Sequence, residues 1–324
     1  MSIVIVGAGM AGLLAARMLA ARRPVVLERQ DALPHNHSAV LRFRSPIVSE
    51  VTGIPFKKVS VVKAVVRWRN PVADSLAYSK KNLGVYRSDR SILRGDEVVE
   101  RYIAPPDFIA KLAEGVDVRF GVAHDFPSHD SFVDGNYTIS TIPMPSLMEV
   151  LRYPLPHPKF TWMPGVNARA RVHGCDAYVS LAVPDPVLRF SRVSITGDEL
   201  IVEFPGASHN YMTAHPGDSI LEVLEALKLL GLPSSALVDP DAIEFVEQRY
   251  AKVAPIEEEE RRKFIFWAST MQGRSFSLGR YATWRPGLLL DDLVHDVRVI
   301  EKLMTSKTMG YEAQRLELLA GGRG

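Results

Sequence analysis

Three glycines near the start of the chain, Gly7, Gly9 and Gly12, have the spacing of a dinucleotide-binding turn. In such a turn the first glycine permits a tight change of direction, the second lets the backbone approach a pyrophosphate, and the third lets a helix pack closely on a strand. Glu28 follows sixteen residues after Gly12, where a carboxylate can hydrogen-bond ribose hydroxyl groups. The spacing predicts a dinucleotide site. The alternative is a tight strand-to-helix turn that binds no ligand.

Basic and aromatic residues form a second candidate set. Leu41 to Arg44 alternates apolar and basic side chains, so Arg42 and Arg44 would share one face of a strand. Arginine forks bind phosphates and carboxylates, and indole rings stack on bases. The set predicts a cleft for an anionic substrate, with scattered arginines and core aromatics as the alternative. Its members are Arg42, Arg44, Arg67, Trp68, Arg69, Arg280, Trp284 and Arg285, and the candidate catalytic residues are His37, Arg42, Arg44, Tyr281 and Trp284.

Histidine and cysteine offer little chemistry of their own. His35 and His37 would face the same side of an extended strand, but no acidic or cysteine partner lies nearby in sequence, so no metal site is predicted. Cys175 is the only cysteine, which excludes an intramolecular disulfide and a cysteine-cluster zinc site and fits a reducing compartment. A plain thiol is favoured over a nucleophile because no basic signature surrounds it.

The composition is that of an ordinary globular protein. The chain has 324 residues, of which 47% are hydrophobic and 23% charged, and its net charge is +2. No apolar run approaches the roughly 18 to 20 residues that a membrane span needs, so a cytoplasmic protein is expected. The largely apolar start does not predict a signal peptide, because a basic first segment is absent and Arg17 interrupts the run.

The candidate residues require elements that hold them in place. Residues 2–6 are apolar and mostly β-branched, residues 13–21 are rich in helix formers, and residues 24–28 are typical of a second strand. This order of strand, turn, helix and strand is the one that a dinucleotide site requires. Further strands are expected at 41–44, 57–69, 116–120, 137–143, 177–183 and 187–204 (with a hairpin turn at 196–199), and further helices at 105–112, from about 146, at 219–230 and from about 289.

One charged segment is predicted to have no binding role. In residues 257–263 four glutamates precede three basic residues, so acids and bases recur at i,i+4 spacing. Such pairs stabilise a helix by a few tenths of a kcal/mol each. The segment therefore predicts a self-paired, solvated helix face.

Three blocks of the chain resemble the FAD-binding flavoprotein superfamily that includes amine oxidases, protoporphyrinogen oxidase and UDP-galactopyranose mutase. The first is the glycine fingerprint closed by Glu28 and Arg29. The second, residues 137–143, is similar to the return strand of that group. The third, Leu278 to Arg280 with the last helix, is similar to the C-terminal flavin motif and is nearer the mutase "G-R" form than the amine-oxidase "G-D" form. The blocks stand near the start, middle and end, so the resemblance spans the chain.

The resemblance implies FAD as the cofactor and assigns residues to its parts. A helix N-terminus beside the flavin would stabilise the negative charge of the reduced ring. The chain departs from the group after Arg29, where a usual Gly-Gly pair is replaced by residues 33–37. The implied contacts are Gly7, Gly9, Met10, Ala11 and Gly12 at the pyrophosphate, Glu28 at the ribose, Val122 at the adenine, Gly279 and Arg280 by the pyrophosphate and ribityl chain, and Leu289 and Leu290 at the pyrimidine end; Arg29, Thr141 and Asp292 complete the cofactor set.

The implied fold class is α/β. A Rossmann-type FAD-binding domain with a parallel, glutathione-reductase-like sheet is expected to be interleaved with a smaller, mainly antiparallel β substrate domain. The expected FAD-binding segments are 1–44, 96–150 and 262–324, and the expected substrate segments are 45–95 and 151–261.

The leading functional hypothesis is an FAD-dependent oxidoreductase of the amine-oxidase type. It would take a hydride from a C–N or C–O bond of an anionic, small-molecule or nucleotide-like substrate to flavin N5, with dioxygen as reoxidant. One alternative is a non-redox, UDP-galactopyranose-mutase-like reaction on a nucleotide sugar. Another is oxidation or cleavage of an amino group or amino acid on a hypermodified pyrimidine in (phage) DNA, and a third is a flavin-binding protein without turnover. No membrane partner is expected, and the sequence leaves the oligomeric state open.

Overall fold

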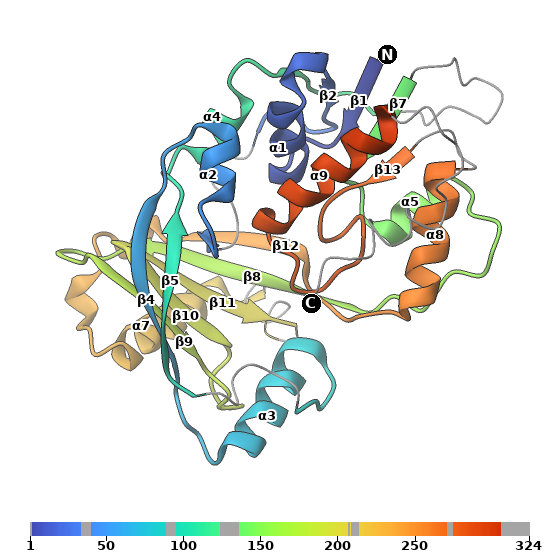
Figure 1. Ribbon diagram of the computed structural model, residues 1–324. Helices are drawn as coiled ribbons and strands as arrows, with labels where there is room; N and C mark the ends of the chain where they lie inside the picture. The colour runs from blue at the N-terminus through green and yellow to red at the C-terminus, as the bar shows by residue number, and fades with distance from the viewer. Residues whose placement is uncertain are drawn as a thin grey trace.

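Two β-sheets, each with its own hydrophobic core, make up the protein (Figure 1). The computed structural model describes residues 2–33, 40–88, 95–123, 136–206, 208, 214–270 and 275–305. The first sheet, sheet A, is parallel throughout. From one edge to the other its strands are β13 (Ser275–Ser277), β7 (Asn136–Ser140), β1 (Ser2–Val6), β2 (Val25–Leu27) and β6 (Asp117–Arg119).

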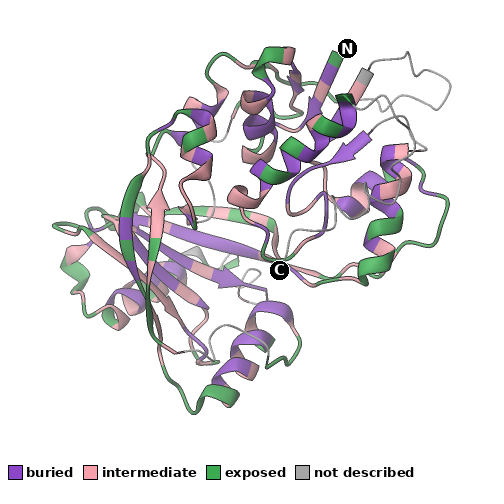
Figure 2. Ribbon diagram, viewed as in Figure 1, coloured by how far each residue is buried: buried purple, intermediate pink, exposed green. Residues whose placement is uncertain are grey.

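Sheet A is largely buried (purple in Figure 2) and packs with helices in one core, whereas Asp117 and Arg119 of its edge strand β6 are exposed. Ile5 and Val6 of the central strand β1 point to opposite faces and are 0% and 7% exposed, as expected for a parallel strand covered on both faces. In the last helix the apolar residues Leu293, Val297 and Ile300 are all buried, so one face of this helix packs into the same core. The helices that share this core are α1 (Met10–Met18), α2 (Ile47–Thr52), α4 (Phe108–Ala113), α5 (Met144–Val150), α8 (Glu258–Thr270) and α9 (Leu290–Thr305). The short η1 (Ala20–Arg22) follows α1 and has no buried residue.

The second sheet, sheet B, is antiparallel except where its fifth and sixth strands pair in parallel. The predicted hairpin is confirmed: β10 and β11 turn at Gly197, whose φ of 69° suits a glycine. In order across the sheet the strands are β12 (Glu244–Val253), β8 (Trp162–Arg171), β11 (Glu199–Pro205), β10 (Arg192–Gly197), β9 (Ala177–Ala182), β4 (Lys57–Val65), β5 (Glu97–Ile103) and β3 (Arg42–Phe43).

Sheet B is strongly curled. Its edge strand β3 is four strand positions from β10, which would be about 19 Å in a flat sheet. Nevertheless, the Arg42 side chain on β3 donates from Nε to Thr196 Oγ1 of β10 at 3.0 Å and from an NH2 group to Val179 O of β9 at 2.9 Å. A single side chain spans this separation only if the sheet folds over, so Arg42 crosses the concave face.

The two faces of sheet B have different chemistry because its strands alternate. Val193 and Ile195 of β10 point into the apolar core that α7 (Pro216–Leu229) covers through Val223. Arg192 points to the other face, where its guanidinium lies 3.3 Å from the Tyr78 hydroxyl of α3 (Pro71–Leu83). One face is therefore a hydrophobic core, and the other is polar and faces α3.

The sequence did not predict α3 because its buried face is polar. Asp74, Ser75, Ser79 and Asn82 are all 0% exposed, so the apolar periodicity of an ordinary surface helix is missing. The start signal was present, since Asn70 caps the helix by accepting a hydrogen bond from Ala73 N at 3.0 Å. No strand was predicted at 162–171 or 244–253, so β8 and β12 were missed as well.

The charged segment at 257–263 is only partly the solvated face that the sequence predicted. Arg261 is 3% exposed, and its Nε donates to Glu258 Oε2 at 2.7 Å. The same guanidinium lies 3.5 Å from Thr283 O. The prediction is wrong for Arg261, because that side chain reaches into the core and contacts the loop before α9.

Strand membership bears on the proposed domain division. Strands β3 and β5 lie within the segments 1–44 and 96–150 that were expected to bind FAD, yet both pair within sheet B. The division into an FAD-binding and a substrate part stays a prediction, and pairing alone would assign these two strands to the substrate part.

Candidate functional site

The carboxyl ends of the sheet A strands meet at one edge, because all the strands are parallel. Backbone hydrogen bonds continue across this edge beyond the strands. Leu278 N donates to Ser140 O, Thr141 N to Val6 O, Gly7 N to Leu27 O, and Glu28 N to Arg119 O, at 2.8–2.9 Å. The predicted cofactor residues Gly279, Thr141, Gly7, Glu28 and Val122 therefore follow one another along a single edge, in the order of the strands that they follow.

The three glycines of the fingerprint have different physical roles. A Cβ atom on Gly7 would lie 2.2 Å from Thr141 Oγ1, and one on Gly12 would lie 2.0 Å from Gly7 O. Gly7 also has a φ of +99°, which L side chains rarely adopt. A Cβ atom on Gly9 would meet nothing within 4 Å. Packing requires glycine at 7 and 12, whereas Gly9 leaves open space in front of the backbone, where a ligand can approach.

Helix α1 presents an uncapped N-terminus to that space. Its N-cap is Gly9, which has no side chain to satisfy the free N–H groups, and its first turn carries no acidic residue. The free N–H groups and the positive end of the helix dipole favour an anion here. Met10 and Ala11, predicted at the pyrophosphate, form this first turn.

Glu28 is held beside the glycine turn. Its Oε2 accepts a hydrogen bond from Ala8 N at 2.7 Å, and its Oε1 accepts one from Gln30 N at 2.9 Å. A carboxylate has about four acceptor positions, so both oxygens retain capacity for ribose hydroxyl groups. Arg29 is exposed, and Val122 is 36% exposed while its N–H donates to Glu28 O at 2.9 Å. The residues predicted at the adenosine end therefore lie next to one another, and Arg29 and Val122 are accessible.

The C-terminal motif packs against the N-terminal one. Gly279 has a φ of +105°, and a Cβ atom on it would lie 3.2 Å from Ala11 Cβ on α1. Arg280 donates from Nε and an NH2 group to Leu288 O at 3.0 and 2.9 Å. This arginine fixes the loop that leads into α9, and α9 lies beside α1 (Figure 1).

Burial raises the pKa of the neighbouring Tyr281, whose ring lies 5.7 Å from that of Tyr250.

The start of α9 is held by its own acids and by Arg44. Asp292 Oδ2 accepts a hydrogen bond from Leu289 N at 2.8 Å and lies 3.6 Å from an Arg44 NH2 group. Asp291 Oδ2 accepts one from Arg44 N at 2.7 Å. Leu289 and Leu290 are half-buried. Arg44 therefore holds the start of α9 through its contacts with Asp291 and Asp292. This helix start is the flavin end that the resemblance implies.

Trp284 is a core residue, which contradicts its prediction as catalytic. Its side chain is 1% exposed, and its Nε1 donates to Ala254 O at 2.8 Å. Its ring centroid lies 4.7 Å from that of Phe160 and 6.3 Å from that of Trp162. No substrate can stack on a ring that is enclosed in this way.

The predicted basic cleft is not assembled from the residues expected to form it. Arg42 and Arg44 do not act as one clamp, because the strand ends at Phe43 and the two side chains bind different elements. Arg285 donates to the buried carboxylate of Asp296, and Arg67 lies 3.4 Å from Asp74. His37 lies outside the described residues.

A different basic cluster lies on the polar face of sheet B. Glu203 accepts from Arg192 at 3.1 Å and from Lys252 at 2.9 Å, so two cations share one carboxylate. Burial would raise the pKa of Glu203, but Arg192 and Lys252 together lower it to about 2. Burial, together with repulsion from Arg192 and Arg101, lowers the pKa of Arg42 to about 10. The alternation of residues 192–196 was the signal that would have placed Arg192 on this polar face.

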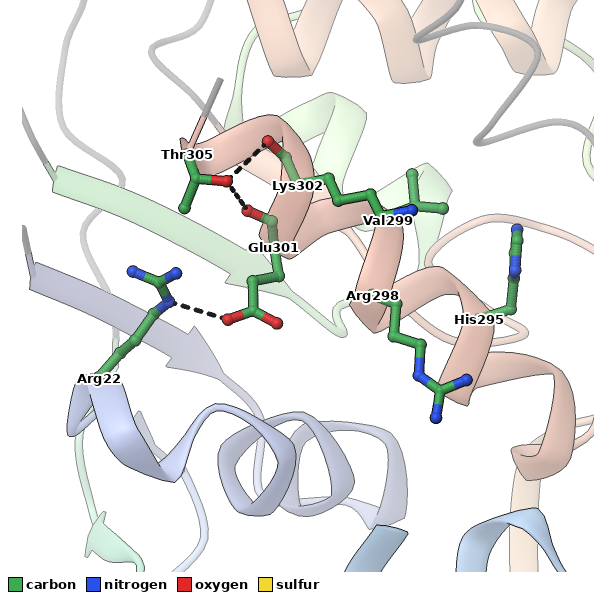
Figure 3. A pocket seen from close by; sticks show the side chains of 7 residues that line it. All are labelled: Arg22, His295, Arg298, Val299, Glu301, Lys302 and Thr305. Atoms are coloured by element: carbon green, nitrogen blue, oxygen red, sulfur yellow. Dashed lines mark hydrogen bonds and ion pairs between the residues drawn. The ribbon is translucent and has the colours of Figure 1, made fainter. Parts of the chain in front are cut away.

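Two surface pockets lie away from the glycine turn. The first lies between Arg22 and the second half of α9, where Arg22 Nε is 3.1 Å from Glu301 Oε1 (Figure 3). Its Thr305 end is about 22 Å along the helix from the start of α9. The second is formed by residues 172–176, 197–198 and 238 at the hairpin end of sheet B. Neither pocket contains a residue of the predicted cofactor set.

The described part of the chain offers neither a metal site nor a membrane span. Among those residues no group of histidine, cysteine, aspartate or glutamate side chains is arranged to hold a metal ion. None of the described helices has both the length and the apolar composition required to span a bilayer.

The comparisons with known proteins identify the fold. No family model and no curated protein matches the chain. The structure of reduced UDP-galactopyranose mutase matches with a TM-score of 0.68 and 12% identity, over 100% of this chain and 98% of that one. A putative protoporphyrinogen oxidase from Exiguobacterium sp. 255-15 matches with a TM-score of 0.57 and 10% identity, over 94% and 98% of the two chains. The p-nitrophenol 4-monooxygenase from Pseudomonas putida DLL-E4 matches with a TM-score of 0.54 and 14% identity, over 97% and 82%. The resemblance and the α/β fold class predicted from the sequence are thereby confirmed at the level of the fold.

Proposed function

We propose that the protein binds FAD along the carboxyl edge of sheet A. The observation that carries this proposal is the order of the edge residues. From β6 to β13 they are Val122, Glu28, the glycine turn, Thr141 and Gly279. The resemblance implies Val122 at the adenine, Glu28 at the ribose, the glycine turn at the pyrophosphate, and Gly279 by the pyrophosphate and ribityl chain. This is the order of the parts along the extended cofactor. Four strand spacings give an edge of about 19 Å for it to cross.

The residues present fit the cofactor. The open space at Gly9 and the uncapped N-terminus of α1 suit a pyrophosphate, and Glu28 has free acceptor positions for a ribose. When bound, FAD supplies a ring that accepts a hydride at N5. The chain's part would be to hold the adenosine end at Glu28 and Val122 and the flavin end between Arg280 and the start of α9.

We infer that the substrate lies over the polar face of sheet B and is anionic. Arg192 and Lys252 both donate to Glu203 there, and Arg42 is close enough to Arg192 and Arg101 for their charges to lower its pKa. This leaves an excess of positive charge in a half-buried place, which a phosphate or carboxylate would offset. Tyr250, which contacts Tyr281, lies on the same strand as Lys252 and links this face to the flavin end.

The reaction that this arrangement supports best is an oxidation by an FAD-dependent oxidoreductase of the amine-oxidase type, with hydride leaving a C–N or C–O bond. A second candidate is a non-redox reaction on a nucleotide sugar. The TM-score of 0.68 to reduced UDP-galactopyranose mutase, over nearly the whole of both chains, favours that candidate over flavin binding without turnover. A nucleotide-like substrate would fit the same basic face, and so would a hypermodified pyrimidine in DNA. A cytoplasmic location is part of the proposal.

The experiment is to purify the protein and record its visible spectrum before and after anaerobic addition of candidate substrates. Bleaching of a flavin band by amines, followed by peroxide release in air, is the outcome expected for the oxidoreductase. Turnover of a nucleotide sugar only after dithionite reduction would favour the mutase-like reaction instead. A protein that has no flavin band and takes up no added FAD would contradict both.

A further inference from the structure

Two neighbouring acids at the start of α9 have different partners. Both oxygen contacts of Asp292 are on Oδ2, which accepts from Leu289 N at 2.8 Å and lies 3.6 Å from Arg44. Asp292 thus caps its own helix. Asp291 uses Oδ2 to accept from Arg44 N at 2.7 Å, which ties the chain after β3 to the helix.

The second oxygen of Asp291 is buried and unsatisfied. Asp291 Oδ1 is shielded from solvent and accepts no hydrogen bond from any residue in the part of the chain that the structure describes. A buried acceptor without a donor costs about 1–3 kcal/mol. Burial raises the pKa of this carboxyl, and the Arg44 N–H lowers it. Such an atom is explained if its donor arrives with a ligand.

The position of Asp291 identifies that ligand. The helix start follows the loop that Arg280 fixes through Leu288 O, and Gly279 on that loop packs against Ala11 at the pyrophosphate end of α1. Asp291 itself stands in the first turn of α9, the helix whose start the resemblance implies at the pyrimidine end of the flavin.

We propose that Asp291 anchors the flavin, with Oδ1 accepting a hydrogen bond from the ring N3–H or from a ribityl hydroxyl group. This inference rests on the proposed binding of FAD and replaces Asp292, the residue that the sequence suggested. A carboxylate in this place also opposes the negative charge of reduced flavin, so Asp291 would hold the reduction potential down.

The test is Asp291→Asn with Glu301→Gln, an acid near the other end of the same helix, as its control. In Asp291→Asn the amide oxygen still accepts from Arg44 N, while the amide nitrogen replaces the acceptor with a donor. We expect FAD to bind about 10- to 100-fold more weakly, since a hydrogen bond to a charged group is lost. The midpoint potential should become more positive, and the melting temperature of the flavin-free protein should not fall. Glu301→Gln should keep FAD affinity within about threefold, because Glu301 lies about 15 Å along the helix from Asp291.

A second experiment distinguishes the two possible donors to Asp291 Oδ1, the flavin N3–H and a ribityl hydroxyl group. FAD methylated at N3 lacks the N3–H donor. If wild type loses as much affinity with this analogue as Asp291→Asn loses with FAD, the hydrogen bond is assigned to N3–H. If wild type binds FAD and its N3-methyl analogue equally well, while Asp291→Asn binds both more weakly, a ribityl hydroxyl is the donor. The inference is overturned if wild type binds FAD and Asp291→Asn binds it equally well with an unchanged potential. Failure of wild type to bind FAD would instead overturn the proposed function along with it.

Discussion

Replacing Gly9 with alanine should weaken FAD binding while leaving the stability of the flavin-free protein nearly unchanged. The new Cβ would meet no atom within 4 Å, and Gly9 has a φ of −68°, which alanine adopts readily. Alanine has fewer conformations than glycine in the unfolded chain, and this difference stabilises the folded variant by about 0.4–1 kcal/mol. Loss of a favoured N-cap residue costs a similar amount. With an unfolding entropy of about 2.1 cal/mol/K per residue, the melting temperature of the flavin-free protein should change by less than about 2 °C.

FAD binding should nevertheless suffer in Gly9→Ala. The methyl group would stand where the backbone of Gly9, Met10 and Ala11 meets the pyrophosphate, and charge-assisted hydrogen bonds contribute about 1.5–3 kcal/mol each. Loss of one such bond predicts an affinity about 10- to 100-fold lower. The assay is fluorescence titration of flavin-free protein with FAD, beside a thermal melt of the same sample.

Gly12→Ala is the control for this prediction. Its Cβ would lie 2.0 Å from Gly7 O, a backbone atom that cannot move aside cheaply. We expect destabilisation of about 1–3 kcal/mol, visible in the melt without any ligand. If Gly9→Ala kept wild-type FAD affinity while folding normally, the assignment of the pyrophosphate to this space would be refuted.

Three other changes test separate parts of the structure. Glu28→Ala should lower FAD affinity while excess FAD restores the folded holoprotein, and unchanged flavin content would count against the ribose contact. Trp284→Ala should lower the free energy of unfolding by about 3–5 kcal/mol in a denaturant melt, because it leaves a cavity in the core. A near-neutral effect would instead support Trp284 as a residue of the candidate site. Glu203 has a pKa of about 2 in the folded protein, below its usual value, so its contribution to stability is complete above about pH 4.5 and is lost as the pH falls toward 2. Acid unfolding of Glu203→Gln should therefore show a weaker pH dependence over that range, and coincident profiles would be evidence against the Arg192–Glu203–Lys252 cluster.

The cofactor edge was predictable because its signals are local. Gly7, Gly12 and Glu28 are dictated by a turn and a strand that are contiguous in sequence, and the structure shows why those residue types are needed. The link to Gly279 required the resemblance, since nothing local in residues 278–280 shows that they pack on α1.

The substrate side was less predictable because curvature decides it. The alternation of Arg42 and Arg44 predicts one clamp, but the strand ends after Phe43 and sheet B curls so that Arg42 reaches β9 and β10. An indole at position 284 is a plausible stacking surface in the sequence, and only tertiary packing shows that Phe160 and Trp162 enclose it. Neither curvature nor enclosure leaves a pattern in the residues themselves.

Helix α3 shows a third limit. Four of its buried side chains, Asp74, Ser75, Ser79 and Asn82, are short and polar. One of them has a partner distant in sequence, since Asn82 Oδ1 accepts from the Ser191 hydroxyl at 3.1 Å. A prediction based on apolar periodicity cannot find a helix of this kind.

The central claim is that one FAD molecule spans segments that are far apart in sequence. Amide hydrogen exchange of flavin-free protein, with and without FAD, tests this most directly. The account predicts new protection at 7–12, 28–30 and 279–292 together, at one FAD per chain. Protection confined to 7–12 and 28–30, or none at all, would contradict it.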